Sequence, residues 1–186
     1  MGTADVQKAL ETLARTLDEL RTPYAIIGAL ALNEFGYQRT TVDVNVLLTA
    51  EGLSAFKQAM PGRGYVEKFS GSRGLRDTVH GIDIDVVLAG EYPGDGKPKP
   101  VAFPDPARAA ERGARVALLP LHAVIELKLA SGMTAPHRLK DLADVQELIR
   151  LQRLPRDLAD RLNPIVRDKY LELWQAVQQH ADDDRR

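Results

Sequence analysis

The chain of 186 residues contains no cysteine, and this absence limits its chemistry. Disulfides, thiolate metal sites and a cysteine nucleophile are excluded, and a reducing cytosol is the natural setting. Long apolar runs are absent too, because the longest, residues 24–32, is far too short to cross a bilayer. Charged residues interrupt the N-terminal segment where a signal peptide needs an apolar stretch. We therefore predict a cytoplasmic protein without a membrane partner.

A strong excess of charge of one sign is also missing. Lysine and arginine number 25 and aspartate and glutamate 26, which gives a net charge of −1. This balance excludes a strongly basic nucleic-acid coat and a polybasic membrane binder, although it allows a local basic cleft. With 44% hydrophobic and 27% charged residues, the composition is that of an ordinary globular protein.

The spacing of apolar residues predicts an α/β (α+β) fold with a helical C-terminal part. Helical spacing predicts a helix over residues 6–20, and short apolar or alternating runs predict strands at residues 24–27, 42–48, 65–69, 75–80 and 82–88. A proline-rich stretch, residues 90–106, is expected to be a long loop. Helices are then expected from residue 120 to Gly132 and over residues 137–151, with two more after Pro155 and Pro164. We predict an α/β core at residues 1–119 and a helical region packed on it at residues 120–186.

Two of the predicted strands place oxygen-bearing side chains on one face. Asp43 and Asn45 are two residues apart in the first strand, and Asp83 and Asp85 repeat that spacing in the second. Side chains at i and i+2 lie on the same face of a strand, so the four converge if the strands are neighbours. Clustered carboxylates repel one another unless a cation is present, and oxygen ligands suit Mg²⁺. The alternative is that these acids lie on an exposed edge strand and only increase solubility.

The residues upstream of the first polar strand favour phosphate binding. Gly28 follows a strand and opens a short helix, and backbone N–H groups at such a junction attract phosphate. Arg39 comes four residues before Asp43, where a guanidinium could hold a phosphate with two hydrogen bonds.

These segments carry a resemblance to a known superfamily. The stretch Ile-Ile-Gly-Ala-Leu-Ala at residues 26–31, followed by Arg-Thr-Thr-Val-Asp-Val-Asn at residues 39–45, resembles the minimal nucleotidyltransferase motif. Residues 126–130 and 138–144 also resemble helices of the same group. The chain is thus similar to toxin nucleotidyltransferases of the AbiEii/AbiGii type, within the DNA polymerase β superfamily. That resemblance implies a nucleotidyltransferase-type mixed sheet flanked by helices.

The resemblance also implies an activity and its partners. A nucleoside monophosphate would pass from an NTP to an acceptor hydroxyl, with Mg²⁺ as cofactor and release of pyrophosphate. Asp43 and Asn45 would ligate the metal, and Asp85 would be the third carboxylate, which activates the hydroxyl; Asp83 competes for that role. The acceptor could be an RNA such as tRNA or a protein, and a toxin would have an antitoxin partner.

A further set of matching residues is implied to bind the nucleotide. They would hold the triphosphate or line the same cleft: Gly28, Ala29, Arg39, Thr41, Lys128, Lys140 and Asp141.

Two departures from the motif keep other functions open. Ala29 replaces a glycine or serine, and Asn45 replaces the second metal-binding aspartate, which removes a negative charge. The first hypothesis is an Mg²⁺-dependent nucleotidyltransferase, as a toxin or in phage defence. The second is a catalytically degenerate nucleotide- or protein-binding module, favoured by Asn45. The third is an interaction protein that meets its partner through the proline-rich loop or the last helix.

Overall fold

The computed structural model describes residues 3–183, which form two compact units. Unit 1 combines the residues up to Glu34 with Gln38–Gly90 and Phe103–Pro120. Unit 2 combines Phe35–Tyr37 and Glu91–Ala102 with the residues from Leu121 onwards. Most of the proline-rich stretch thus groups with the C-terminal helices. The domain boundary predicted between residues 119 and 120 stays a prediction.

Unit 1 is built on a mixed sheet. Within residues 3–183, seven strands are hydrogen-bonded in the order β3-β4-β5-β2-β1-β7-β6. Pairs β2/β5 and β1/β7 are parallel, and the other neighbouring pairs are antiparallel. The strands are β1 (Ala25–Ile27), β2 (Asp43–Leu48), β3 (Tyr65–Glu67), β4 (Leu75–Asp77), β5 (Ile82–Leu88), β6 (Glu111–Arg112) and β7 (Ala117–Leu118).

The five strands expected from apolar patterns are present, but β3 ends at Glu67 and β4 at Asp77, earlier than predicted. Strand β6 was not predicted. Its two residues, Glu111 and Arg112, are both exposed and polar, so no apolar pattern marks them. They become a strand only by pairing with β7. A strand of this kind depends on its neighbour rather than on its own side chains.

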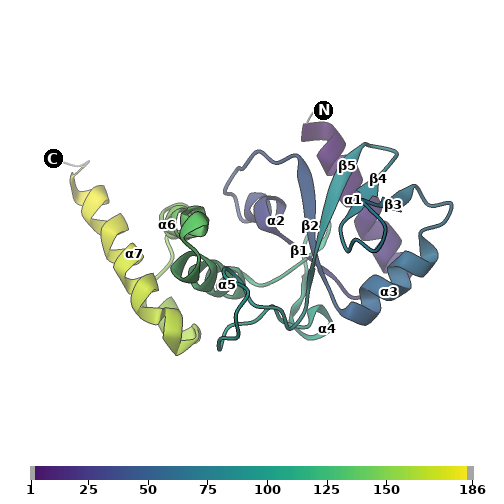
Figure 1. Cartoon of the computed structure of the whole chain (residues 1–186). Helices are drawn as coiled ribbons and strands as arrows, with labels where there is room; N and C mark the ends of the chain where they lie inside the picture. The colour runs from purple at the N-terminus through teal and green to yellow at the C-terminus, as the bar shows by residue number, and fades with distance from the viewer. Residues whose placement is uncertain (1–2, 184–186) are drawn as a thin grey trace. The chain divides into compact units, whose positions relative to one another are not determined.

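Helices cover the sheet because the alternation in β2 and β5 supplies an apolar face. Val44, Val46, Ile82, Ile84 and Val86 are buried in one core cluster. Within the described residues four helices belong to unit 1, and α1 contacts both β2 and β5 (Figure 1). They are α1 (Thr3–Glu19), α2 (Gly28–Glu34), α3 (Ala50–Ala59) and α4 (Pro106–Ala109).

Unit 2 is helical. Helices α5, α6 and α7 contact one another and are joined by short 3-10 turns (Figure 1). The elements are α5 (Leu121–Thr134), η1 (Pro136–Arg138), α6 (Leu139–Gln152), η2 (Arg156–Arg161) and α7 (Pro164–Asp183). None of the helices in the described part of the chain is long and apolar enough to cross a membrane.

The prediction that α5 ends at Gly132 is wrong. The helix continues to Thr134, and Gly132 lies inside it. A Cβ atom at this position would lie 2.6 Å from Leu142 Cγ and 3.2 Å from the Leu142 backbone nitrogen. Gly132 therefore allows α6 to approach α5 closely instead of ending the helix.

Candidate active site

The candidate site lies on one face of the two central strands. Strand β2 pairs in parallel with β5, and the register sets Asp43 opposite Asp83 and Asn45 opposite Asp85. All four side chains are partly exposed, whereas Val44 and Ile84 between them are fully buried. Because side chains alternate along a strand, the four polar groups share the face opposite Val44 and Ile84. Both strands are interior to the sheet, which excludes the edge-strand alternative.

Gly28 borders this polar face. It follows β1 directly, and the β1/β2 register pairs the preceding residue, Ile27, with Asn45. The φ angle of Gly28 is +72°, a left-handed conformation that side chains disfavour. A Cβ atom there would also lie only 3.3 Å from Asn45 Cβ. A glycine is thus needed at this position for two reasons, and it brings the α2 entrance against Asn45.

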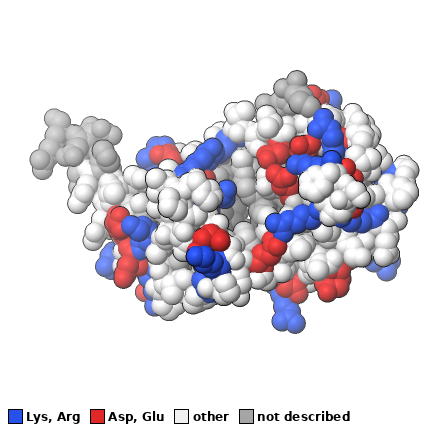
Figure 2. All heavy atoms as spheres, viewed as in Figure 1, with Lys and Arg blue, Asp and Glu red and all other residues white. Residues whose placement is uncertain are grey.

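Two cations bind the carboxylates of β5. Lys68 Nζ lies 2.7 Å from Asp85 Oδ1 and 3.3 Å from Asp83 Oδ2. Arg76 Nη1 donates to Asp83 Oδ1 at 2.6 Å, as expected from its place opposite Asp83 in the β4/β5 register. Figure 2 shows acidic and basic side chains side by side where β4 and β5 lie.

The cations also set the ionisation of this face. Slight burial raises the pKa of Asp83, but the bonds from Arg76 and Lys68 outweigh this effect and leave the pKa lowered. For Lys68, burial lowers the pKa, but the bonds to Asp85 and Asp83 outweigh this effect and leave the pKa raised. The carboxylate of Asp83 and the ammonium of Lys68 therefore stay charged together at neutral pH.

The segment between α2 and β2 is fixed by side-chain bonds. Asn33 Nδ2 donates to the Arg39 carbonyl at 3.1 Å, and the Arg39 N–H donates back to Asn33 Oδ1 at 2.5 Å. Thr41 Oγ1 donates to Asp43 Oδ1 at 2.5 Å. These bonds hold the Arg-Thr-Thr-Val-Asp segment at the entrance of β2 and orient the Asp43 carboxylate.

The donor set suits a divalent cation, but its carboxylates are already engaged. Asp43, Asp83, Asp85 and the Asn45 carbonyl offer oxygen ligands of the kind that Mg²⁺ binds. Among the residues that the structure describes, however, no three His, Cys, Asp or Glu side chains gather as a metal-binding group. The oxygen donors thus lie on adjacent strands, but their side chains are oriented toward Lys68, Arg76 and Thr41.

Two of the predicted nucleotide-binding residues of unit 2, Lys128 and Asp141, belong to an ion cluster. Lys128 Nζ lies 2.8 Å from Asp141 Oδ1 and 2.7 Å from Asp144 Oδ2. Ser131 Oγ and Arg138 Nε both donate to Asp141 Oδ2, at 2.6 and 2.9 Å. Lys128 is only 13% exposed in this cluster, so its contact with a phosphate stays a prediction.

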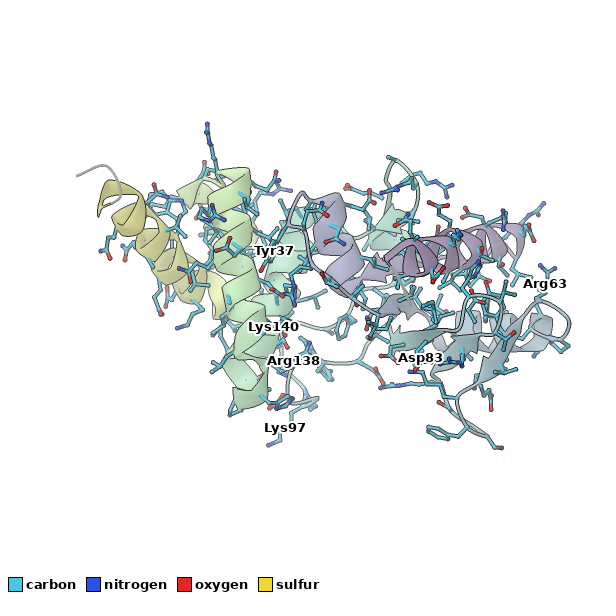
Figure 3. All side chains as sticks on the ribbon, turned by 90° about the horizontal axis from the view of Figure 1, so that it is seen from above. Tyr37, Arg63, Asp83, Lys97, Arg138 and Lys140 are labelled. Carbon is cyan, nitrogen blue, oxygen red and sulfur yellow. The ribbon has the colours of Figure 1, made fainter. Side chains whose placement is uncertain are left out.

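Lys140 is placed differently from Lys128 and Asp141. It lies in the first turn of α6 and is exposed, next to the buried Asp141. Figure 3 shows Lys140 and Arg138 together near the start of this helix. Its predicted role in binding nucleotide also stays a prediction.

Sequence reasoning missed Lys68 and the role of Asn33. Lys68 was hidden because it follows a three-residue strand at the start of a glycine-containing loop. Arg76 was not among the predicted site residues either. In the structure Leu75 and Asp77 are buried and Arg76 between them is exposed, which turns Arg76 toward the acidic side of β5.

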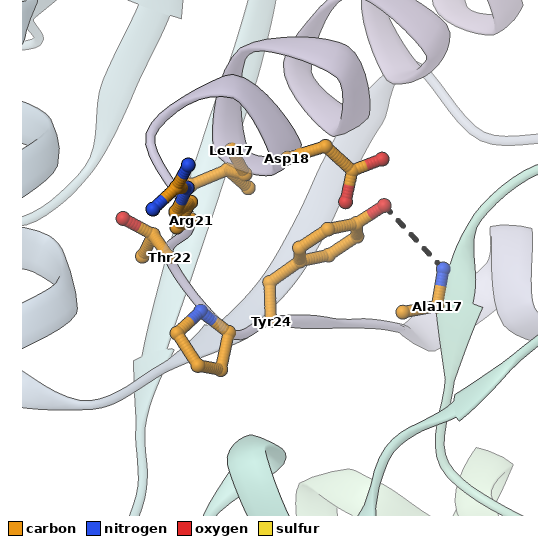
Figure 4. Close-up of a pocket in the computed structure, with 7 residues that line it drawn as sticks. Leu17, Asp18, Arg21, Thr22, Tyr24 and Ala117 are labelled. Carbon is orange, nitrogen blue, oxygen red and sulfur yellow. Dashed lines mark hydrogen bonds between the residues drawn. The ribbon is translucent and has the colours of Figure 1, made fainter.

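A separate pocket opens at the other end of β1. It has a volume of about 240 Å³ and lies near Tyr24, the residue before β1, whereas Gly28 follows that strand (Figure 4). The Tyr24 hydroxyl accepts a hydrogen bond from the Ala117 N–H at 3.4 Å. Asp18 is bound by Arg112 through two bonds of 2.9 and 3.0 Å. Two polar groups that line the pocket, the Tyr24 hydroxyl and the Asp18 carboxylate, are thus already bonded within the protein. None of the residues that line the pocket was predicted as a site residue.

Comparison with known proteins supports the fold through structure rather than sequence. No family model matches the chain, and no curated protein matches it. Solved structures do. The solution structure of the antibiotic-resistance factor ANT(2'')-Ia is 17% identical with a TM-score of 0.55, over 98% of this chain and 100% of that one. ANT(2'')-Ia in complex with adenylyl-2''-tobramycin is 15% identical with a TM-score of 0.55, over 96% and 99%. A proposed nucleotidyltransferase from H. pylori is 14% identical with a TM-score of 0.51, over 96% and 95%.

These matches confirm the predicted fold class. The chain has a mixed α/β architecture of the nucleotidyltransferase type, and its structural neighbours are nucleotidyltransferases. At such low identity, the likeness concerns the fold. Function has to be argued from the site.

Proposed function

We propose that this protein is a nucleotidyltransferase that moves a nucleoside monophosphate from an NTP to an acceptor hydroxyl with the help of Mg²⁺. The observation that carries the proposal is the parallel register of β2 and β5, which sets Asp43 beside Asp83 and Asn45 beside Asp85. Gly28 adds a backbone turn against the same face. Carboxylates beside a half-buried glycine turn suit a metal-bound phosphate.

Each residue of the face has a task in this reaction. Asp43, Asn45 and Asp85 are the proposed ligands, with Asp83 as the alternative to Asp85. Bound at these oxygens, Mg²⁺ would stabilise the charge that develops on the transferring phosphoryl group. Asp85 would accept the proton of the attacking hydroxyl, whose oxygen displaces pyrophosphate from the α-phosphorus.

Binding of the nucleotide is proposed for the residues that the resemblance assigns to it. The N–H groups at Gly28 and Ala29 would donate to the phosphates, with Arg39 and Thr41 at the β2 entrance. The residues Lys128, Lys140 and Asp141 complete the proposed set. Lys140 is the most accessible of the three, because Lys128 and Asp141 already bond each other.

The proposal is tested by transfer of label from α-³²P-NTPs with Mg²⁺. Total RNA, total protein and tobramycin serve as separate acceptors, the last because a structural neighbour was solved with adenylyl-2''-tobramycin. We expect wild-type transfer and at least about a hundredfold loss in Asp85→Asn, the scale of removing a general base. Absence of transfer by the wild type and by Asn45→Asp, without stabilisation by NTP and Mg²⁺, would overturn the proposal.

A degenerate binding module is the second candidate, and Asn45 is the observation that favours it. An amide ligand contributes an oxygen but no charge, so metal affinity falls. If Asn45→Asp alone transfers label, the wild-type protein binds nucleotide without turnover. Stabilisation of both proteins by NTP and Mg²⁺ would accompany that result.

The biological role is proposed on the resemblance to AbiEii-type toxins. A toxin of a toxin–antitoxin or phage-defence pair would arrest growth when expressed alone, and the arrest would disappear in Asp43→Asn. Loss of growth that persists in Asp43→Asn would contradict a role that depends on catalysis. A cytoplasmic location is part of this proposal, and the absence of cysteine favours it.

A further inference from the structure

Lys68 holds the carboxylate that the proposed reaction needs. Its Nζ lies 2.7 Å from Asp85 Oδ1 and 3.3 Å from Asp83 Oδ2, so one ammonium bridges neighbouring carboxylates on β5. Among the described residues, Lys68 is the cation that bonds Asp85, whereas Asp83 also has Arg76. Removing Lys68 would therefore leave Asp85 without its ion pair but leave Asp83 with one.

The backbone places Lys68 for this contact. The Lys68 N–H donates to the Gly74 carbonyl at 3.1 Å, which closes the loop between β3 and β4. A Cβ atom at Gly74 would lie 3.2 Å from Lys68 Cδ and 3.5 Å from Cε. The aliphatic stem of Lys68 thus crosses Gly74 on its way to β5. A side chain at residue 74 would push the stem away while the charge remains.

The ion pair between Lys68 and Asp85 can be broken at low cost. Lys68 is 27% exposed and Asp85 48% exposed, and ion pairs with this much solvent contribute little to stability. A lysine ammonium is a point charge on a flexible stem, so it can leave its partner without backbone movement. A divalent cation at Asp85 would repel the ammonium at close range, so the two compete for the carboxylate.

We propose that Lys68 is an internal counter-ion that occupies Asp85 in the metal-free protein and is displaced when a divalent cation binds. The proposal rests on the function proposed above. Lys68 compensates the charge of Asp85 before the metal arrives, and it lowers the affinity of the site for the metal. Displacement also frees Asp85 to serve as ligand or base.

Binding of Mn²⁺ to the full chain tests this role without any measurement of activity. Free Mn²⁺ is followed by electron paramagnetic resonance during titration of the wild type, Lys68→Gln and Gly74→Ala. We expect Lys68→Gln to bind Mn²⁺ about fivefold more tightly, the scale of one exposed ion pair. Gly74→Ala should shift affinity in the same direction and keep the charge, since Gly74 has no left-handed φ to preserve.

The matched control is Arg63→Gln. Arg63 forms an exposed ion pair with Glu19 at 3.0 Å and belongs to the same unit as Lys68. Figure 3 shows it away from Asp83. Arg63→Gln removes the same unit of positive charge as Lys68→Gln. Because Arg63 pairs with Glu19 and not with Asp83 or Asp85, its removal should leave the Mn²⁺ affinity unchanged.

The outcomes separate this inference from the proposed function. Equal or weaker Mn²⁺ binding by Lys68→Gln, beside normal wild-type binding, overturns the role of Lys68 alone. An equal gain in Arg63→Gln also overturns it, because the effect would then be general charge. No Mn²⁺ binding by any variant overturns both the counter-ion role and the proposed metal site.

Discussion

Each unit of this protein contains one lysine held between two aspartates, but the surroundings differ. In unit 1, Lys68 bonds Asp83 and Asp85, whose side chains are 40% and 48% exposed. In unit 2, Lys128 bonds Asp141 and Asp144, whose side chains are only 8% and 4% exposed. Both clusters therefore have the same charged groups, but water reaches the aspartates of unit 1 far more than those of unit 2.

This difference teaches which cluster can respond to a ligand. Water and salt screen an exposed ion pair, so its loss costs little and its members can exchange partners. A buried pair has lost its hydration, so removal of one member leaves an uncompensated charge. We infer that the Lys68 cluster belongs to function and that the Lys128 cluster mainly holds α5 to α6.

The largest effect is expected from Lys128→Met. It leaves the Asp141 and Asp144 carboxylates in place without their shared ammonium, at an expected cost of about 3–5 kcal/mol. Urea unfolding followed by fluorescence measures this in unit 2 specifically, because the single tryptophan, Trp174, lies on α7. Lys169→Met is the matched control, since Lys169 pairs with a Glu172 side chain that is 63% exposed. A loss of stability no larger than that of the control would contradict the comparison.

The second prediction concerns acid. Burial raises the pKa of Asp141, but Lys128, Ser131 and Arg138 outweigh it and leave the pKa lowered. A carboxylate with a lowered folded pKa stabilises the fold above its unfolded pKa of about 3.9, and this contribution disappears as pH falls through the folded pKa. Asp141→Asn should therefore cost about 2 kcal/mol at pH 7 and progressively less as the pH falls below the unfolded pKa.

Unfolding free energies of the wild type and Asp141→Asn, measured between pH 7 and pH 2, check this slope. Trp174 fluorescence again reports on unit 2. A constant difference over the whole range would show that Asp141 contributes by packing and not by its charge.

A smaller effect is expected from Gly132→Ala, which tests why the Lys128 cluster is buried. The added methyl group would lie 2.6 Å from Leu142 Cγ and so force α5 and α6 apart. We expect a loss of about 1–2 kcal/mol, because overpacking outweighs the gain in helix propensity. In the background of Leu142→Ala the same change should cost nothing or stabilise. An equal cost in both backgrounds would contradict this contact.

The smallest effect on stability is expected from Lys68→Gln. Loss of its exposed ion pairs should cost less than about 1 kcal/mol, and 1 M salt should remove the difference from wild type. Hydrogen exchange of the β5 amides measures it, because tryptophan does not report on unit 1. A cost as large as that of Lys128→Met would mean that the two clusters have the same structural role.

Much of the candidate site was visible in the sequence. The alternation of Asp43 with Asn45 and of Asp83 with Asp85 predicted two strands with polar faces, and β2 and β5 are those strands. The acid side chains alone left open whether the strands were neighbours. Parallel pairing of β2 with β5 joins residues about 40 positions apart, and no local pattern encodes that contact.

The sequence does not show which cations pair with these acids. Lys68 follows a short strand whose pattern is weak, and its contact with Asp85 depends on the β3–β4 loop and on Gly74. Likewise, nothing near Lys128 in the chain marks it as buried with two aspartates from the next helix.

The sequence by itself determined the local elements of this protein and the identity of its oxygen donors. Periods of two and of about 3.6 residues place apolar side chains on one face, and this local rule holds before any tertiary contact forms. Only the tertiary structure decided which strand lies beside which and how much water reaches each lysine. Burial and pairing depend on distant segments, and they separate an exchangeable ion pair from a structural one.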